Sequence, residues 1–89
     1  MGKAQRPRPK RLGEKLVQIR NSLGLSQNEL IKILAFEEIG LVQGTISTYE
    51  LGKREPSLLL LLRYARLAKI SVEQLIDDEL DLPNITASN

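Results

Sequence analysis

The chain has 89 residues, a net charge of +2, and neither cysteine nor histidine. This length suits one small domain, and the missing residue types exclude a disulfide framework and disfavour a thiolate or zinc site. No apolar run approaches the ~20 residues of a membrane span, and the basic start lacks the apolar segment of a secretory signal, so we expect a cytoplasmic protein without membrane contact or cofactor.

Charge is unevenly distributed along the chain. Residues 1–11 contain basic side chains, two prolines and no acidic residue. We expect a disordered arm with polyproline character, which either lies along DNA phosphates or in a minor groove or only aids solubility. Residues 73–81 carry acidic side chains and no basic one, and this segment should face away from DNA.

The first predicted helix covers about residues 12–23 and ends at Gly24, a residue typical of helix C-termini. Arg20 lies at the border of its apolar stripe, where a charge needs a partner. The stripe is formed by apolar residues at helical spacing: Leu12, Leu16, Ile19 and Leu23.

The second predicted helix begins with a capping box formed by Ser26 and Glu29. It continues to about Glu38, before an irregular connection that contains Gly40. Gln27 occupies the first helical position, where its amide and the exposed backbone N–H groups could bind a phosphate. The alternative for Gln27 is a solvated residue in the first turn.

The third predicted helix begins near Gln43 and ends at Gly52. Ile46 and Tyr49 point toward one side and form its apolar face. The opposite face is small and mostly hydroxylated, so it can enter a DNA major groove and bind base edges. Its residues are Gly44, Ser47, Thr48 and Leu51.

Two basic residues, Lys53 and Arg54, follow this helix where the nearest phosphates would lie, and the Gln43 amide at its start suits pairing with adenine. The alternative is an ordinary surface helix with a polar face. Glu50 lies at the edge of the apolar side, as Arg20 does on the first helix. We therefore predict a charge-assisted hydrogen bond between Arg20 and Glu50, against the alternative of two independent surface charges.

Two further helices are predicted. Ser57 caps a helix over about residues 58–69 that has two apolar faces: one with Leu58, Leu61, Leu62 and Ala65, the other with Leu60, Tyr64 and Leu67. Ser71 and Gln74 form a second capping box. It opens a fifth helix that should carry Val72, Leu75, Ile76 and Leu80. Pro83 ends the pattern, so we expect a domain over residues 12–82 and a frayed tail over 83–89.

More residues are apolar than one small domain needs, and contiguous apolar surface usually marks an interface. We predict a homodimer that uses the fifth helix and the segment after it, through Ile76, Leu80 and Leu82. A less favoured site is Leu60 with Tyr64. The alternative is that Leu60 and Tyr64 pack beneath the fifth helix, while the tail covers Ile76 and Leu80.

From Leu12 to about Leu80 the chain resembles the Cro/CI-type helix-turn-helix family, also called lambda-repressor-like or XRE. The resemblance rests on Gly24-Leu25-Ser26-Gln27-x-Glu29-Leu30, on Thr45-Ile46-Ser47-x-Tyr49-Glu50-x-Gly52-Lys53-Arg54-x-Pro56-Ser57, and on Ile70-Ser71-x-x-x-Leu75. It implies an all-α, five-helix domain in which the second and third helices form the DNA-binding unit.

The resemblance also implies roles for single residues. Gln27 matches a phosphate anchor, and Lys53 and Arg54 match a phosphate-contacting loop. Arg20 and Glu50 match a pair that joins helices one and three in several members. Bases are read at the positions of Gln43, Gly44 and Thr48, and the backbone is supported or touched at those of Thr45 and Ser47.

Three departures from the family pattern concern the recognition helix. The connection over residues 35–43 is longer than the usual turn of about three to four residues. Ile31 replaces a small residue that lets the two helices approach closely. Gly44 cannot read a base with a side chain.

These observations predict a sequence-specific transcriptional regulator that binds a palindromic site in double-stranded DNA as a homodimer. Two alternatives remain: an antitoxin or restriction-modification controller with the same domain, or a protein-interaction module that has lost DNA binding and uses the 35–43 connection. An enzyme is not expected, since the chain has no histidine or cysteine and no carboxylate pair in an evident cleft.

Overall fold

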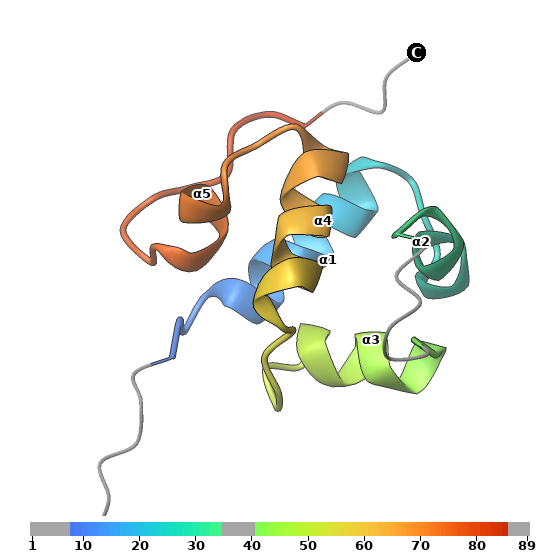
Figure 1. Ribbon diagram of the computed structural model, residues 1–89. Coiled ribbons are helices and arrows are strands. Elements are labelled where there is room, and N and C mark those ends of the chain that lie inside the picture. The colour runs from blue at the N-terminus through green and yellow to red at the C-terminus, as the bar shows by residue number, and fades with distance from the viewer. Residues whose placement is uncertain (1–7, 35–40, 86–89) are drawn as a thin grey trace, which may run out of the picture.

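The computed structural model describes residues 8–34 and 41–85, which form five α-helices and, within these ranges, no strand (Figure 1). The helices are α1 (Leu12–Ser22), α2 (Gln27–Leu34), α3 (Gln43–Glu50), α4 (Leu58–Ala68) and α5 (Val72–Ile76). The predicted all-α class with five helices is therefore confirmed. None of the helices described is long and apolar enough to cross a membrane.

All five helices contribute to one hydrophobic core. α3 packs against α1 and α2, α4 packs against α2 and α5, and α1 also contacts α5. Burial of apolar side chains is the main stabilising contribution in such a domain. The fully buried apolar side chains are Leu16, Ile19, Leu30, Ile46, Leu60, Tyr64 and Leu75.

The helix ends follow the predicted capping chemistry. In the first box, Ser26 Oγ accepts from the N–H of Glu29 at 3.0 Å, and Glu29 Oε1 accepts from the N–H of Ser26 at 2.8 Å. Ser57 Oγ accepts from the N–H of Leu60 at 3.2 Å, and the box at the start of α5 is also complete. Each cap satisfies a backbone donor that the helix leaves unpaired.

The prediction that Leu80 lies on the fifth helix is wrong. α5 ends at Ile76, because Asp77 adopts an extended backbone with φ −92° and ψ 111°. At this end of the helix, Lys15 Nζ donates to the carbonyls of Gln74 and Asp77, at 2.8 Å each. A side-chain amine thus satisfies one carbonyl in the last turn of α5 and another just after it.

Both predicted apolar faces of the fourth helix turn toward the core, with the exception of Leu58 at its start. Leu58 is 78% exposed, whereas its expected neighbour Leu61 is 5% exposed and lies in the core. Leu60 and Tyr64 are fully buried, so the alternative that they form a dimer surface fails. The expected extension of α2 to about Glu38 and most of the 35–43 connection lie outside the described residues.

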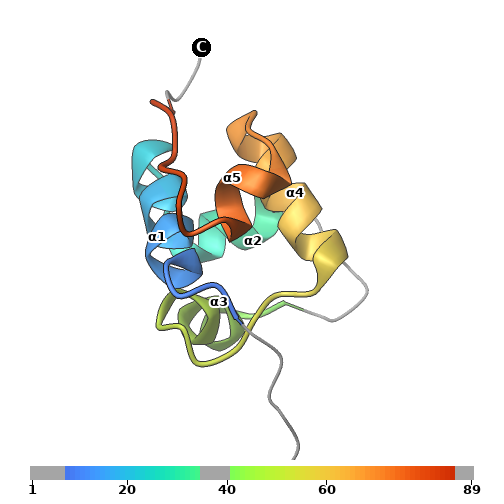
Figure 2. The same cartoon turned by 90° about the vertical axis from the view of Figure 1, so that its left-hand side faces the viewer.

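The last part of the expected arm belongs to the folded domain. The N–H groups of Lys10 and Arg11 donate to the Asp78 carboxylate at 2.8 and 2.9 Å, and these bonds lower the pKa of Asp78. Arg11 also donates to Asp81 Oδ1 at 2.7 Å. Figure 2 shows the segment after α5 passing α1. The acidic segment therefore holds the base of the arm, and residues 1–7 lie outside the described part.

The start of the expected tail also packs on the domain. Leu82 and Ile85 are partly buried against the core. Residues 83–85 therefore continue the segment that covers the core after α5.

Candidate nucleic-acid interface

The α3 helix lies at one end of the molecule, at the bottom of Figure 1, where its outer face is open. Ile46 and Tyr49 are buried and attach the helix to the core. On the outer side, Gln43 and Gly44 are exposed, and Leu51 just after the helix is 67% exposed. α3 thus presents a small, uncharged surface to solvent.

A charged network fixes α3 to α1. Arg20 Nε donates to Glu50 Oε2 at 2.7 Å, and Arg20 Nη2 donates to Glu50 Oε1 at 3.1 Å. The third donor, Nη1, binds the carbonyl of Leu25 at 2.9 Å. The ion pair predicted from the sequence is therefore present, and hydrogen bonding to Glu50 raises the pKa of Arg20. Since the Glu50 side chain is only 6% exposed, its charge is directed inward rather than toward a polyanion.

Gln27 joins this network from α2. Its Nε2 donates to Glu50 Oε1 at 3.0 Å, a contact that the sequence analysis did not anticipate. One of the two amide hydrogens is thereby committed to Glu50, and this bond does not use the second. The bond orients Gln27 at the start of α2, where first-turn N–H groups favour an anion.

The hydroxyl of Thr48 is engaged within α3. Thr48 Oγ1 donates to the Gly44 carbonyl at 2.8 Å, which leaves the Thr48 methyl group and an acceptor lone pair for any outside partner. Within the part of the chain that the structure describes, a Cβ placed on Gly44 would have no atom within 4 Å apart from its chain neighbours and its own helix backbone. At Gly44 the outer face is therefore backbone with space beside it.

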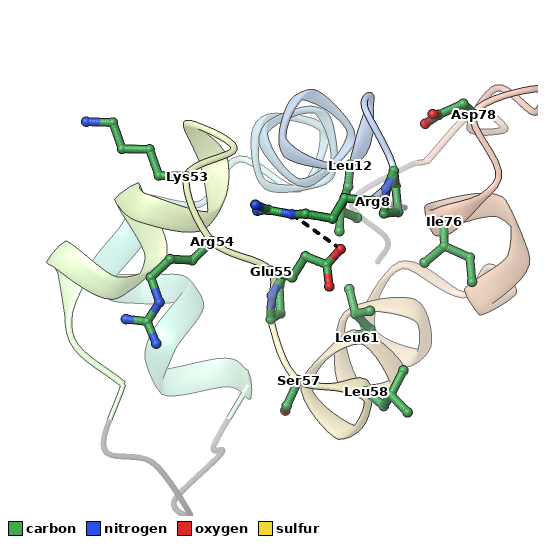
Figure 3. A pocket seen from close by; sticks show the side chains of 12 residues that line it. Arg8, Leu12, Lys53, Arg54, Glu55, Ser57, Leu58, Leu61, Ile76 and Asp78 are labelled. Atoms are coloured by element: carbon green, nitrogen blue, oxygen red, sulfur yellow. Dashed lines mark ion pairs between the residues drawn. The ribbon is translucent and has the colours of Figure 1, made fainter. Parts of the chain in front are cut away.

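The basic loop after α3 is held by backbone hydrogen bonds. Gly52 adopts φ +78°, and the N–H of Lys53 reaches back to the Thr48 carbonyl at 3.0 Å. Lys53 and Arg54 are both exposed and are among the residues that line the neighbouring groove (Figure 3). This loop places two cations directly beside the outer face of α3.

An open groove lies on the other side of this loop (Figure 3). Arg8 borders it and pairs with Glu55, with Nε and Oε2 3.6 Å apart. Its apolar lining includes Leu12 of α1, Leu58 and Leu61 of α4, and Ile76 of α5.

The helix-turn-helix family model matches residues 16–75, from α1 through α5. This chain belongs to the helix-turn-helix family. It is a Cro/CI-type domain, and the family is one of DNA-binding regulators. A comparison with curated proteins found no match.

In this helix-turn-helix domain, all eight residues expected to contact DNA lie on α2, on α3 or in the loop that follows α3, and none is buried. Four are exposed: Gln43, Gly44, Lys53 and Arg54. The other four are partly exposed: Gln27, Thr45, Ser47 and Thr48.

The residues expected at a dimer interface differ in their surroundings. Ile76 is 40% exposed, and Leu80 is partly exposed. Leu82 instead packs partly buried against its own core, so less of its surface is open to a partner.

Two residues that position the site were missed. Lys15 falls between Leu12 and Ile19 on the apolar stripe of α1, a position that could have marked it as buried. Gly13 lies against the end of α3, and a Cβ there would come within 2.8 Å of the Glu50 carbonyl oxygen. No sequence signal within α1 identifies that close approach.

Proposed function

We propose that this protein is a sequence-specific transcriptional regulator that inserts α3 into the major groove of double-stranded DNA. The observation that carries the proposal is the orientation of Glu50, the sole acidic residue of α3. Its carboxylate binds Arg20 and Gln27 and leaves an uncharged outer face beside the Lys53–Arg54 loop. Such a face approaches base edges without repelling the phosphates.

The residues divide into phosphate and base contacts. Gln27, Lys53 and Arg54 bind phosphates and supply affinity that depends on salt. Gln43, at the exposed start of α3, pairs through its amide with adenine. Ser47 and Thr48 add base contacts, and Thr45 supports or touches the DNA backbone. Gly44, which has no side chain, lets a base edge approach the helix closely.

We also propose that two copies bind a palindromic operator in the cytoplasm. One helix of this size reads few base pairs, and half-sites about 34–36 Å apart require a two-fold dimer. Support comes from the groove of Figure 3, where Leu58 is 78% and Ile76 is 40% exposed. The dimer contact uses Ile76, and Leu80 extends it. Leu82 contributes only the part of its side chain that is exposed to solvent.

Selection of bound duplexes from a random library tests the proposal. A DNA reader enriches a defined sequence and loses affinity steeply as salt rises, whereas a protein-interaction module does neither. Gln43→Ala should relax the preference, at about 1–3 kcal/mol for a good base contact, while Lys53→Ala should weaken all sequences alike and flatten the salt slope. If Lys53→Ala changes the preference and Gln43→Ala does not, the proposed orientation of α3 is wrong.

Sedimentation tests the dimer. The free protein should associate at high micromolar concentration or on the selected palindrome, and Ile76→Asp should prevent this. Lys32→Asp on exposed α2 is the matched control. A strict monomer in both conditions would contradict the two-fold arrangement.

A further inference from the structure

The middle of the outer face of α3 is a ridge formed by Gly44, Thr48 and Leu51, which follow one another at i, i+4 and i+7 and so lie in line along a helix. Gly44 has no side chain. The Thr48 hydroxyl hydrogen is used at 2.8 Å on the Gly44 carbonyl. Leu51 is 67% exposed. The ridge therefore offers methyl groups and no free side-chain donor, unlike Gln43 and Ser47 beside it.

This chemistry restricts what the ridge can recognise. In the major groove, base edges carry hydrogen-bond donors and acceptors and one apolar feature, the C5-methyl group of thymine. A methyl-bearing ridge gains from contact with that group because apolar surface leaves water on both sides. Cytosine lacks the methyl group and therefore offers the ridge no such apolar contact.

Space along the ridge allows such contact. Among residues 8–34 and 41–85, no atom outside the local helix backbone lies within 4 Å of the position that a Gly44 side chain would take, so the start of α3 can approach a base closely. Lys53 and Arg54 follow Leu51 directly and, by binding phosphates, would hold the end of the helix in the groove. Leu51 would then meet base edges rather than solvent.

We propose that Thr48 and Leu51 recognise the 5-methyl groups of thymines in each half-site. This inference rests on the proposed insertion of α3 into the major groove and adds to it the base feature that the ridge reads. Leu51 thereby becomes a specificity-determining residue in addition to the eight predicted DNA contacts. Because 5-methylcytosine carries the same group, it should replace thymine in part wherever the methyl group alone is read.

The experiment compares two forms of one duplex. A duplex enriched by the wild-type protein from a random library is made with thymine and with uracil, which pairs identically but lacks the methyl group. We expect the uracil form to bind about fourfold more weakly for each contacted methyl group. Equal affinity of the wild-type protein for both forms overturns the inference and leaves the proposed function standing, whereas failure to enrich any duplex overturns the function itself.

Matched variants assign the effect to the ridge. Thr48→Ser keeps the hydroxyl but loses the methyl group, so it should reduce the uracil penalty. Thr48→Val keeps a methyl group and should retain the penalty. Leu51→Asn should also reduce it. An undiminished penalty in both Thr48→Ser and Leu51→Asn would assign the effect to DNA shape or to other residues and overturn the inference.

Discussion

The helices α3 and α5 are both anchored by a cation from α1, but the two cations find different partners. Arg20 pairs with a carboxylate, that of Glu50, at 2.7 Å. Lys15 is fully buried and donates to backbone carbonyls, those of Gln74 and Asp77, at 2.8 Å each. The helix proposed to face DNA is thus held through a side-chain pair, and the helix proposed to carry the dimer contact is held through its own C-terminus.

The difference affects what a substitution breaks. Removing one member of a charge pair leaves the other member buried without compensation. Removing a cation that binds carbonyls leaves neutral acceptors, which cost less to bury unpaired. The α3 anchor should therefore be the more sensitive of the two, although its cation is the more exposed one.

The largest expected effect is that of Arg20→Ala. It removes the charged partner of the 6% exposed Glu50 carboxylate, which keeps only the neutral donor Gln27, and it leaves the Leu25 carbonyl without the Arg20 donor. We expect a cost of roughly 3–5 kcal/mol in the free energy of unfolding. Urea unfolding measures the loss. A double-mutant cycle with Glu50→Ala should show that the two costs are strongly non-additive. Wild-type stability of Arg20→Ala would show that α3 is held by apolar packing alone.

Lys15→Met should have the next largest effect. The carbonyls of Gln74 and Asp77 lose their donor, at about 1–3 kcal/mol, while methionine fills most of the space. Hydrogen exchange should show the loss concentrated in α5. Lys32→Met, on the exposed side of α2, removes the same charge and should change stability by at most ~0.5 kcal/mol. A Lys15→Met protein as stable as the wild type would mean that α5 needs no anchor.

Gly13→Ala probes a second contact between α1 and α3. The added Cβ would lie 2.8 Å from the Glu50 carbonyl oxygen and 3.1 Å from that of Tyr49. We expect a net destabilisation of about 1–2 kcal/mol, because overpacking outweighs the better helix propensity of alanine. Gly44→Ala is the matched control, with open space at its Cβ, and should be neutral or stabilising by up to ~1 kcal/mol. Thermal melts of both variants in parallel decide whether the contact is as tight as the distances indicate.

The two anchors also differ in how far the sequence reveals them. Arg20 and Glu50 each lie at the border of an apolar stripe on separate predicted helices, so periodicity alone suggests their pairing. The capping serines and Gly24 are similarly local signals, and they gave correct helix starts and ends. Lys15 binds carbonyls at sequence separations of 59 and 62 residues. Because every residue has a backbone carbonyl, the sequence does not indicate which carbonyls Lys15 binds.

The same limit explains the other corrections. Asp78 accepts from the backbone N–H groups of Lys10 and Arg11, which any residue except proline could supply. The sequence showed a basic arm and an acidic segment, but it did not show that the acidic segment binds the base of the arm. Leu80 matched helical spacing, but the helix ends at Ile76, where Lys15 binds backbone carbonyls that the spacing does not indicate. In the candidate interface, the residue positions were predictable, while the internal bonds of Gln27 and Thr48 were not.

Asp78→Asn tests whether the contact between Asp78, after α5, and the base of the arm makes the stability of the protein depend on pH. The N–H groups of Lys10 and Arg11 lower the pKa of Asp78 from its ordinary value of 3.8. Its stabilising contribution is therefore present above about pH 4 and is lost as the pH falls below 3.8 through the lowered value. The melting temperature of Asp78→Asn should be below that of the wild type at neutral pH, and the gap should narrow in acid. Glu73→Gln, at an exposed site, should not show this convergence.

The smallest effect is expected for Tyr64→Phe, which tests how far the α3 anchor extends. Burial, and after it the charge of Glu50, raises the pKa of Tyr64. Its hydroxyl is buried and has no hydrogen-bond partner in the part of the chain that the structure describes. Because deleting an unpaired buried hydroxyl removes a desolvation cost, the stability of the variant should equal that of the wild type or exceed it by up to ~1 kcal/mol in urea unfolding. A loss of stability would instead place the hydroxyl within the Arg20–Glu50 network and make that anchor larger than one ion pair.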